Sequence, residues 1–249
     1  MSGRLDGQRV IVTGSGRGIG RAIAHAAARE GARVVVHGRT EGSAARVALE
    51  IREAGGLAEP FAFHLEDMSA LQAGMGEIVA AGPVDALINN AAQNRPGLLV
   101  ASAPEDIASA LRANLLAPVL AARAVLPSML AQRRGVIVNI GSVSASRPAR
   151  GQSVYVAAKG GLESFTRALA VEYGKKGIRA VCLRPGPVDT DMMAATKNLD
   201  QDLVRRVPLG RIARPEEIAN FCIFLLTDDA AFVTGSVLDA DGGFSCSTT

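Results

Sequence analysis

Short apolar runs alternate with stretches of helical periodicity along the chain. The first run, RVIVTG from residue 9, leads into glycines, a helix-like segment and a second β-branched run, VVV, and together these predict a β-α-β unit. Five further runs of the buried-strand type lie at 58–63, 84–88, 136–140, 178–183 and 236–238. Apolar strands that alternate with helices are typical of a parallel sheet covered on both faces. The pattern therefore predicts an α/β protein with a seven-stranded parallel sheet.

Length and composition are those of one large α/β domain. The chain has 249 residues, of which 48% are hydrophobic and 20% charged, and no low-complexity tract or Pro/Gly/Ser-rich linker divides it. We therefore expect residues 1–249 to form a single domain. The main irregular insertion is expected at 189–210, between a strand and a helix that starts at Pro215, where it can cover a site.

The charge pattern argues against nucleic-acid and membrane partners. The net charge is only +3, without a basic block, and the longest strongly apolar run, FCIFLL, is too short to span a bilayer. Cys182, Cys222 and Cys246 lie far apart and lack zinc or redox spacing, so we expect no metal site. With a polar N-terminus, the chain is interpreted as a soluble cytoplasmic protein whose ligand can still carry phosphate.

Four glycines, Gly14, Gly16, Gly18 and Gly20, lie between the first predicted strand and the first helix. Glycine lets the backbone turn tightly and approach a pyrophosphate, and a helix N-terminus offers free N–H groups and a positive dipole end. Such a cluster also occurs for backbone reasons alone, but its place between strand and helix favours dinucleotide binding.

The end of the second predicted strand, VVVHGRT, carries no acidic residue. An acid at this point usually holds the ribose hydroxyls of NAD, whereas Arg39, with Arg17 from the glycine loop, suits a 2'-phosphate. The alternative is that both arginines are solvated surface groups. We expect NADP(H) as cofactor, and we expect His37 to be an edge residue and not a ligand.

Tyr155 and Lys159 are four residues apart in the segment VYVAAKGG. On a helix they share a face, and a nearby ammonium lowers the pKa of a phenol, so Lys159 can tune Tyr155 for proton transfer. Taken alone, such a pair more often consists of a packed tyrosine and a lysine that extends to solvent.

Two further features accompany this pair. Ser142 follows a predicted buried strand, at the strand end where open α/β sheets bind ligands, and can donate to a substrate oxygen. Pro118 interrupts a predicted helix and cannot donate to the carbonyl of Asn114, so a kink is expected that leaves this carbonyl free to hold a water.

As a set, these motifs closely resemble the short-chain dehydrogenase/reductase family. The motifs are T-G-x-x-x-G-x-G, Asn89-Asn90-Ala91, the Asn-x-x-x-Pro helix, the strand-end serine, Y-x-x-x-K and Pro185-Gly186. The resemblance extends from Gly7 to Gly243 and implies a doubly wound Rossmann-type domain. It further implies that Tyr155 donates or accepts the proton, Ser142 polarises the carbonyl, Lys159 lowers the tyrosine pKa and binds nicotinamide ribose, and Asn114 holds a relay water.

By the same resemblance, further residues hold the cofactor. Asp67 in EDMS would meet the adenine, Asn90 would support the central strands, and Val188 and Thr190 would hold the carboxamide. The full expected cofactor set is Gly14, Ser15, Arg17, Gly18, Ile19, Gly20, Arg39, Asp67, Met68, Asn90, Tyr155, Lys159, Pro185, Gly186, Val188 and Thr190. The family usually has glycine where this chain has Ala92, and we expect only a slight local adjustment there.

Two C-terminal segments look most like 3-oxoacyl-acyl-carrier-protein reductases. The substrate pocket is expected to include Ser142, Ser144, Gln152, Tyr155, Met192 and Met193. A basic rim near its mouth, where an acidic carrier protein could dock, is implied at Arg133, Arg134, Lys175 and Lys176, although lysines and arginines at helix ends are also ordinary solvated groups.

Three functions remain open at this point. The first is an NADPH-dependent reductase of a ketone in a 3-oxoacyl thioester, with Tyr155 as proton donor. The second is a dehydrogenase of a sugar, polyol, steroid or other secondary alcohol, and the third is a non-catalytic dinucleotide sensor. The resemblance also implies a homotetramer packed through helices around residues 104–131 and 153–174.

Overall fold

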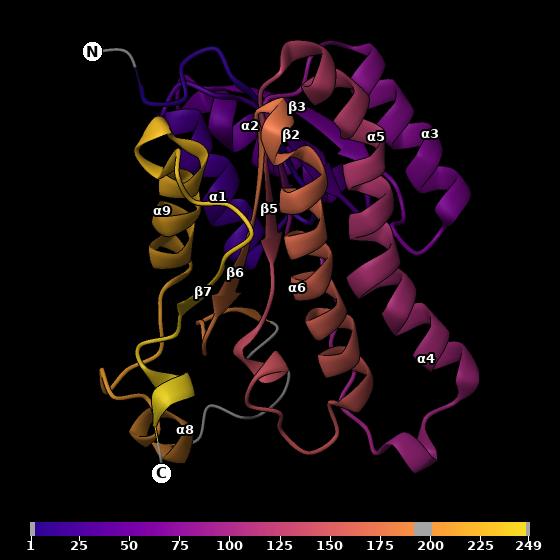
Figure 1. Cartoon of the computed structure of the whole chain (residues 1–249), viewed down its shortest axis with the longest axis vertical. Coiled ribbons are helices and arrows are strands. Elements are labelled where there is room, and N and C mark those ends of the chain that lie inside the picture. The colour runs from indigo at the N-terminus through magenta and orange to yellow at the C-terminus, as the bar shows by residue number, and fades with distance from the viewer. Residues whose placement is uncertain (1–2, 192–200, 248–249) are drawn as a thin grey trace.

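A computed structural model describes residues 3–191 and 201–247 and shows seven strands in one sheet (Figure 1). All adjacent strands pair in parallel, in the order β3-β2-β1-β4-β5-β6-β7. The strands are β1 (Arg9–Val12), β2 (Arg33–Gly38), β3 (Leu57–Ala62), β4 (Ala86–Asn89), β5 (Gly135–Ile140), β6 (Ile178–Pro185) and β7 (Val237–Ala240). The predicted Rossmann-type sheet is confirmed.

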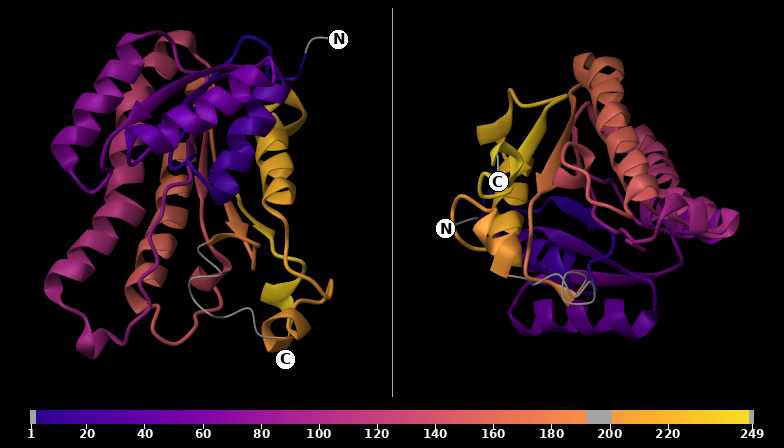
Figure 2. Two further views of the ribbon diagram at one scale, coloured as in Figure 1. Left: turned by 180° about the vertical axis from the view of Figure 1, so that it is seen from behind. Right: turned by 90° about the horizontal axis from the view of Figure 1, so that it is seen from below.

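Helices cover both faces of this sheet (Figure 2). The longer ones are α1 (Gly18–Arg29), α2 (Glu41–Glu53), α3 (Met68–Ala80), α4 (Pro104–Leu111), α5 (Ala117–Gln132), α6 (Ser153–Tyr173) and α9 (Pro215–Leu226). Because successive strand residues point to opposite faces, Val10 and Val12 pack in one core with α1, α2 and α9, whereas Ile11 packs in the other with α3, α5 and α6. Two covered faces explain why the interior strands β1 and β4 are mostly apolar and buried, whereas the edge strands β3 and β7 carry Glu59 and Asp239 and are more exposed.

The strand order reverses between β1 and β4, which are neighbours in the sheet although 76 residues separate Val10 from its partner Ala86. In open α/β sheets, ligands bind outside the carboxyl ends of the strands at this switch point. The glycine loop follows β1, Asn90 follows β4 and Ser142 follows β5, so these expected site residues share one edge of the sheet.

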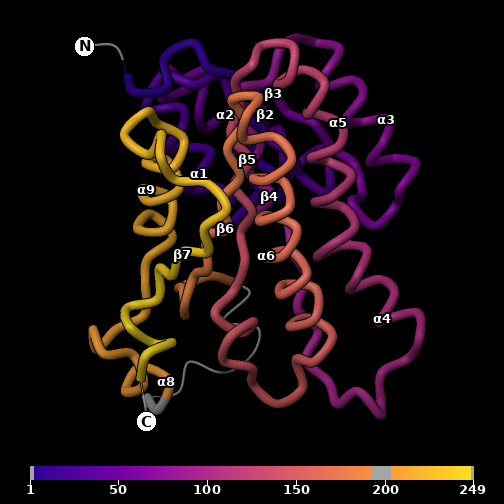
Figure 3. The backbone as a smooth tube through the Cα atoms, in the orientation of Figure 1, coloured from indigo at the N-terminus to yellow at the C-terminus, as the bar shows by residue number. Residues whose placement is uncertain are grey.

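The expected insertion at 189–210 is only partly described. The short helix α8 (Gln201–Arg205) lies in it, at the carboxyl edge of the sheet (Figure 3), and α9 begins at Pro215 as predicted. The expected substrate contacts Met192 and Met193 lie outside the described residues.

The helical stretch Pro104–Gln132 is apolar enough to pass a length-and-composition test for a membrane span. Half of its most apolar window is buried inside the protein, and α5 supplies residues such as Val125 and Met129 to the core. This stretch is therefore weak evidence for a membrane segment.

Candidate active site

The glycine loop approaches its neighbours so closely that side chains would collide. A Cβ atom on Gly20 would lie 2.4 Å from both the Gly14 carbonyl oxygen and the Asn90 amide nitrogen, and Gly14 and Gly18 have φ values of +66° and +54°. Helix α1 then begins at Gly18 without a side-chain cap or an acid in its first turn. Its free N–H groups can bind an anion, as the sequence predicted for a pyrophosphate.

Asn90 and His37 fasten the start of this loop. The Asn90 amide donates to the carbonyl oxygens of Thr13 and Gly14 at 2.9 and 3.1 Å, and the Gly14 N–H donates to Nδ1 of His37 at 3.1 Å. The expectation that His37 is an edge residue was wrong, because β2 is an interior strand and this histidine is 2% exposed. Burial lowers the pKa of His37 to about 4, so the imidazole is neutral near pH 7.

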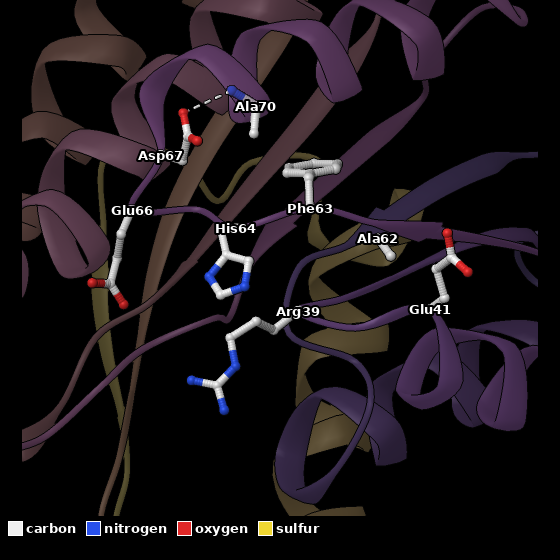
Figure 4. A pocket seen from close by; sticks show the side chains of 8 residues that line it. All are labelled: Arg39, Glu41, Ala62, Phe63, His64, Glu66, Asp67 and Ala70. Atoms are coloured by element: carbon white, nitrogen blue, oxygen red, sulfur yellow. Dashed lines mark hydrogen bonds between the residues drawn. The ribbon is translucent and has the colours of Figure 1, made fainter.

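A cavity of about 610 Å³ opens beside the ends of β2 and β3 (Figure 4). Arg39 extends into it and has no hydrogen-bond or ion-pair partner among the described residues, and the same holds for the exposed Arg17 side chain. Asp67 lines this cavity too, but its carboxylate caps α3 by accepting the N–H groups of Ser69 and Ala70. The expected adenine contact of Asp67 and the phosphate contacts of the two arginines stay predictions.

Ser142 and Tyr155 meet at the end of β5. The Ser142 oxygen accepts the Ser144 N–H at 3.2 Å, and its hydroxyl is close enough to Tyr155 to affect the pKa of the phenol. Burial raises the pKa of Tyr155, and the nearby Ser142 hydroxyl, which favours the phenolate, opposes this effect. The expectation that Lys159 lowers the pKa of Tyr155 stays a prediction.

Lys159 lies on the same side of α6, with its Nζ 5.7 Å from the centre of the Tyr155 ring. This lysine is 2% exposed and donates to the Ile140 carbonyl at 2.7 Å. Burial lowers its pKa to about 8, because water no longer solvates the ammonium. The tyrosine and the lysine thus share a helix face, as their spacing predicted.

The helix interruption predicted at Pro118 takes the form of a π-helical turn, Arg112–Leu116. Asn114 lies in this turn with its side chain fully buried, and its amide exchanges two bonds with the backbone of Gln93, at 2.8 and 3.0 Å. The Gln93 side chain continues outward, donating to Ser109, which donates to Glu66 at 2.6 Å. Sequence reasoning missed this chain, since its members lie 16 and 43 residues apart.

A second missed network lies beneath the site. The Asn89 amide donates to Asn139 at 2.8 Å, and the Asn139 amide donates to the Thr166 hydroxyl at 2.9 Å. All three side chains are buried, so each needs a partner, and together they tie β4 and β5 to α6. The signal in the sequence for this network was a polar residue near the end of each apolar strand, Asn89 for β4 and Asn139 for β5.

The segment after β6 faces the glycine loop. A Cβ on Gly18 would lie 3.4 Å from a methyl of Thr190, and Val188 is buried. Gly186 leaves no room for a side chain, since a Cβ there would lie 2.6 Å from Asp241 Cα. This arrangement brings the expected carboxamide contacts next to the expected pyrophosphate site.

The departure at Ala92 requires no unusual backbone. Arg133 is the one non-glycine residue with positive φ in the described part of the chain. An alanine at position 92 therefore carries no left-handed strain, and its effect on cofactor binding stays a prediction.

The expected basic rim does not form near the site within one chain. Arg133 ends α5 beside Gly177, and Lys175 and Lys176 follow α6, so all lie at the amino ends of β5 and β6. Tyr155 is near the first turn of α6, which places it about 30 Å from Lys175, at 1.5 Å per helical residue. A pocket mouth at Tyr155 is thus at the opposite edge of the sheet.

Two amide oxygens lie unpaired among the described residues around this site. The Asn94 and Gln152 side-chain oxygens are buried and accept no hydrogen bond. A bond from the Gly97 N–H to the Gly151 carbonyl brings their two segments together. Gln152 directly precedes α6, three residues before Tyr155, and its expected place in the substrate pocket stays a prediction.

Comparisons with known proteins agree with this geometry. A family model described as enoyl-(acyl carrier protein) reductase matches residues 14–245. The 3-oxoacyl-acyl-carrier-protein reductase FabG of Chlamydia trachomatis is 37% identical over 98% of this chain and 100% of its own length, and a human 3-oxoacyl-acyl-carrier-protein reductase is 41% identical over 93% and 95%. The chain belongs to the short-chain dehydrogenase/reductase family of oxidoreductases.

Solved structures give a different substrate name. A putative NAD(P)-dependent gluconate 5-dehydrogenase of Beutenbergia cavernae, with bound NADP, superposes with a TM-score of 0.95 and is 37% identical over 98% of both chains. A gluconate 5-dehydrogenase of Burkholderia cenocepacia, in complex with NADP and tartrate, reaches 0.92 at 35% identity and the same coverage. The family is thus common to all these relatives, whereas the substrate differs between them.

Proposed function

We propose that the protein is an NADPH-dependent carbonyl reductase whose substrate is the ketone of a 3-oxoacyl thioester. The observation that carries this proposal is that Ser142, Tyr155 and Lys159 lie together at the carboxyl edge of the sheet, the edge that also carries the glycine loop. Relatives named 3-oxoacyl-acyl-carrier-protein reductase support the substrate class.

The residues present fit a phosphate-bearing dinucleotide. The uncapped start of α1 suits a pyrophosphate, and the unpaired Arg39 guanidinium suits a 2'-phosphate better than a free ribose hydroxyl. Among the described residues, three carboxylates line the cavity beside β2 and β3, of which Asp67 caps a helix and Glu66 accepts from Ser109, while Glu41 lies in the first turn of α2.

In the proposed reaction, bound NADPH supplies a hydride to the carbonyl carbon. Ser142 donates a hydrogen bond to the carbonyl oxygen and favours the charge that develops there. Tyr155 gives its proton to that oxygen, and its raised pKa keeps this proton in place until the charge appears. With a pKa of about 8, Lys159 is mostly protonated at neutral pH and stabilises the phenolate that remains.

The test compares NADPH and NADH oxidation with acetoacetyl-CoA or an N-acetylcysteamine thioester, in the wild type and in Tyr155→Phe. NADPH-dependent turnover that the substitution abolishes is the expected result. NADPH binding without turnover of any thioester or other ketone would instead favour a dinucleotide sensor, and equal or better turnover with NADH would refute the cofactor assignment.

A second candidate is an NADP-dependent dehydrogenase of a polyhydroxy acid. The gluconate 5-dehydrogenases among the structural relatives support the same class. Oxidation of gluconate with NADP⁺, faster than reduction of the thioesters, would select this candidate.

We also propose the assembly that the family resemblance implied, a homotetramer in the cytoplasm. Apolar side chains on the expected interface helices support it, since Val171 on α6 is 84% exposed and Leu116 before α5 is 40% exposed. A carrier protein that docks at Arg133 and Lys175 would have to serve the site of another copy. A monomeric mass by light scattering would refute both the tetramer and a carrier protein that serves the site of another copy.

A further inference from the structure

His37 occupies a position where three segments meet. It lies in β2, its ring contacts Phe63 after β3 with 4.2 Å between ring centres, and its backbone carbonyl accepts the Ser15 N–H of the glycine loop at 2.9 Å. The side chain is 2% exposed, so its ring nitrogens depend on protein partners.

The partners fix which ring nitrogen carries the proton. Nε2 lies 3.0 Å from the Phe63 carbonyl oxygen, which can only accept, so Nε2 is the protonated donor. Nδ1 of the neutral ring is then an acceptor, and it receives the Gly14 N–H at 3.1 Å. The ring therefore bridges the end of β3 and the glycine loop with a defined polarity.

Gly14 depends on this acceptor. It has a φ of +66°, its carbonyl accepts from Asn90, and a Cβ on it would lie 2.7 Å from Ala91 Cα, so the residue is held between the ends of β2 and β4. Without Nδ1, the Gly14 N–H would be partly buried and without an acceptor, and the turn would rotate to find one.

We propose that His37 is a positioning residue for cofactor binding, in that its Nδ1 holds the Gly14 N–H and thereby presets the glycine loop. This proposal rests on the proposed function, because it assumes that the loop binds NADPH. A preset loop gives up less conformational entropy on binding, so the contribution of His37 is to cofactor affinity and not to the chemical step.

Two substitutions separate the bonds of the ring. His37→Asn puts an amide oxygen near the place of Nδ1 and keeps an acceptor for Gly14, whereas His37→Gln puts an amide nitrogen near the place of Nε2 and keeps only a donor for Phe63. The control is His25→Asn, since the His25 ring is bonded to Glu50 on α2 and, among the described residues, makes no bond of its own to the glycine loop.

The measurements are NADPH affinity by fluorescence titration and steady-state kinetics on the full-length variants. We expect His37→Asn and the control to bind like the wild type, and His37→Gln to raise the Kd and the KM for NADPH by about tenfold, with kcat at saturating NADPH unchanged. Equal affinities of the two His37 variants and the wild type, or weaker binding by His37→Asn than by His37→Gln, would overturn the proposal.

Hydrogen–deuterium exchange of the peptide spanning residues 13–20, without cofactor, gives a second readout. Faster exchange in His37→Gln than in His37→Asn is expected, and the reverse order would contradict the preset loop. If the two variants show this order and the wild type binds NADPH but reduces no ketone, the proposed function is refuted. The role of His37 in cofactor binding would still be supported.

Discussion

Replacing the buried Lys159 with methionine should stabilise the protein near neutral pH and remove its activity. Lowering the pKa of Lys159 from about 10.5 to about 8 corresponds to a free-energy penalty of roughly 3 kcal/mol for the charged lysine in the folded protein. Lys159→Met removes this penalty and also the 2.7 Å bond to the Ile140 carbonyl, a loss of about 1 to 2 kcal/mol. A net gain of about 1 to 2 kcal/mol at pH 7 follows.

The pH dependence of the stability difference between Lys159→Met and the wild type tests the burial penalty more directly. Contributions that do not change with pH, such as packing, cancel when the difference at one pH is subtracted from that at another. Between pH 8 and 10.5 the unfolded lysine keeps its proton while the folded one has lost it, so wild-type stability rises with pH through this window. From pH 7 to pH 9.5, the advantage of Lys159→Met should shrink by about 2 kcal/mol.

The assay is urea denaturation, followed by circular dichroism, of the wild type, Lys159→Met and Lys176→Met at several pH values from 7 to 9.5. Lys176 is exposed, so the curve of its variant should run parallel to that of the wild type. If the Lys159→Met difference were also constant with pH, the burial penalty assigned to Lys159 would be wrong.

Three other results follow from the site. The lowered pKa of His37 means that the folded protein loses stability as the pH falls from about 6.5 to about 4, by up to roughly 3 kcal/mol, and urea denaturation of His37→Asn should lack this loss. Arg39→Ala should raise the KM for NADPH by about 10-fold or more and leave the KM for NADH unchanged in steady-state kinetics, whereas equal effects would deny a phosphate contact. Tyr155→Phe should keep NADPH binding by fluorescence but lose ketone reduction, and retained turnover would exclude Tyr155 as proton donor.

Most of the fold and the position of the candidate site followed from local patterns. Apolar strands alternating with helices allow few other arrangements, and Ser142 at a strand end with Tyr155 and Lys159 four residues apart depends only on sheet and helix geometry. The π-helical turn before Pro118 was foreseen as an interruption but not in its form, because several helical geometries relieve the same missing N–H.

What could not be predicted depends on burial and on distant contacts. His37 resembles any polar residue in a strand until the order of β1, β2 and β3 places it inside. The raised pKa of Tyr155 results from packing that the Y-x-x-x-K spacing does not describe. The large distance between Lys175 and Tyr155 could have been predicted from the sequence, because it follows from the length and direction of α6 alone.

The pairing of β1 with β4 also bears on how the protein folds and opens. The ladder between β1 and β4 has three residue pairs, from Val10↔Ala86 to Val12↔Ile88, and their long separation in sequence makes this contact slow to form. The glycine loop lies on one side of that junction and Ser142 on the other, so partial unfolding along it would dismantle the site while each half keeps its own strands. A ligand that contacts both sides would therefore stabilise the closed junction. The fraction of molecules with an open junction would fall as the ligand concentration rises.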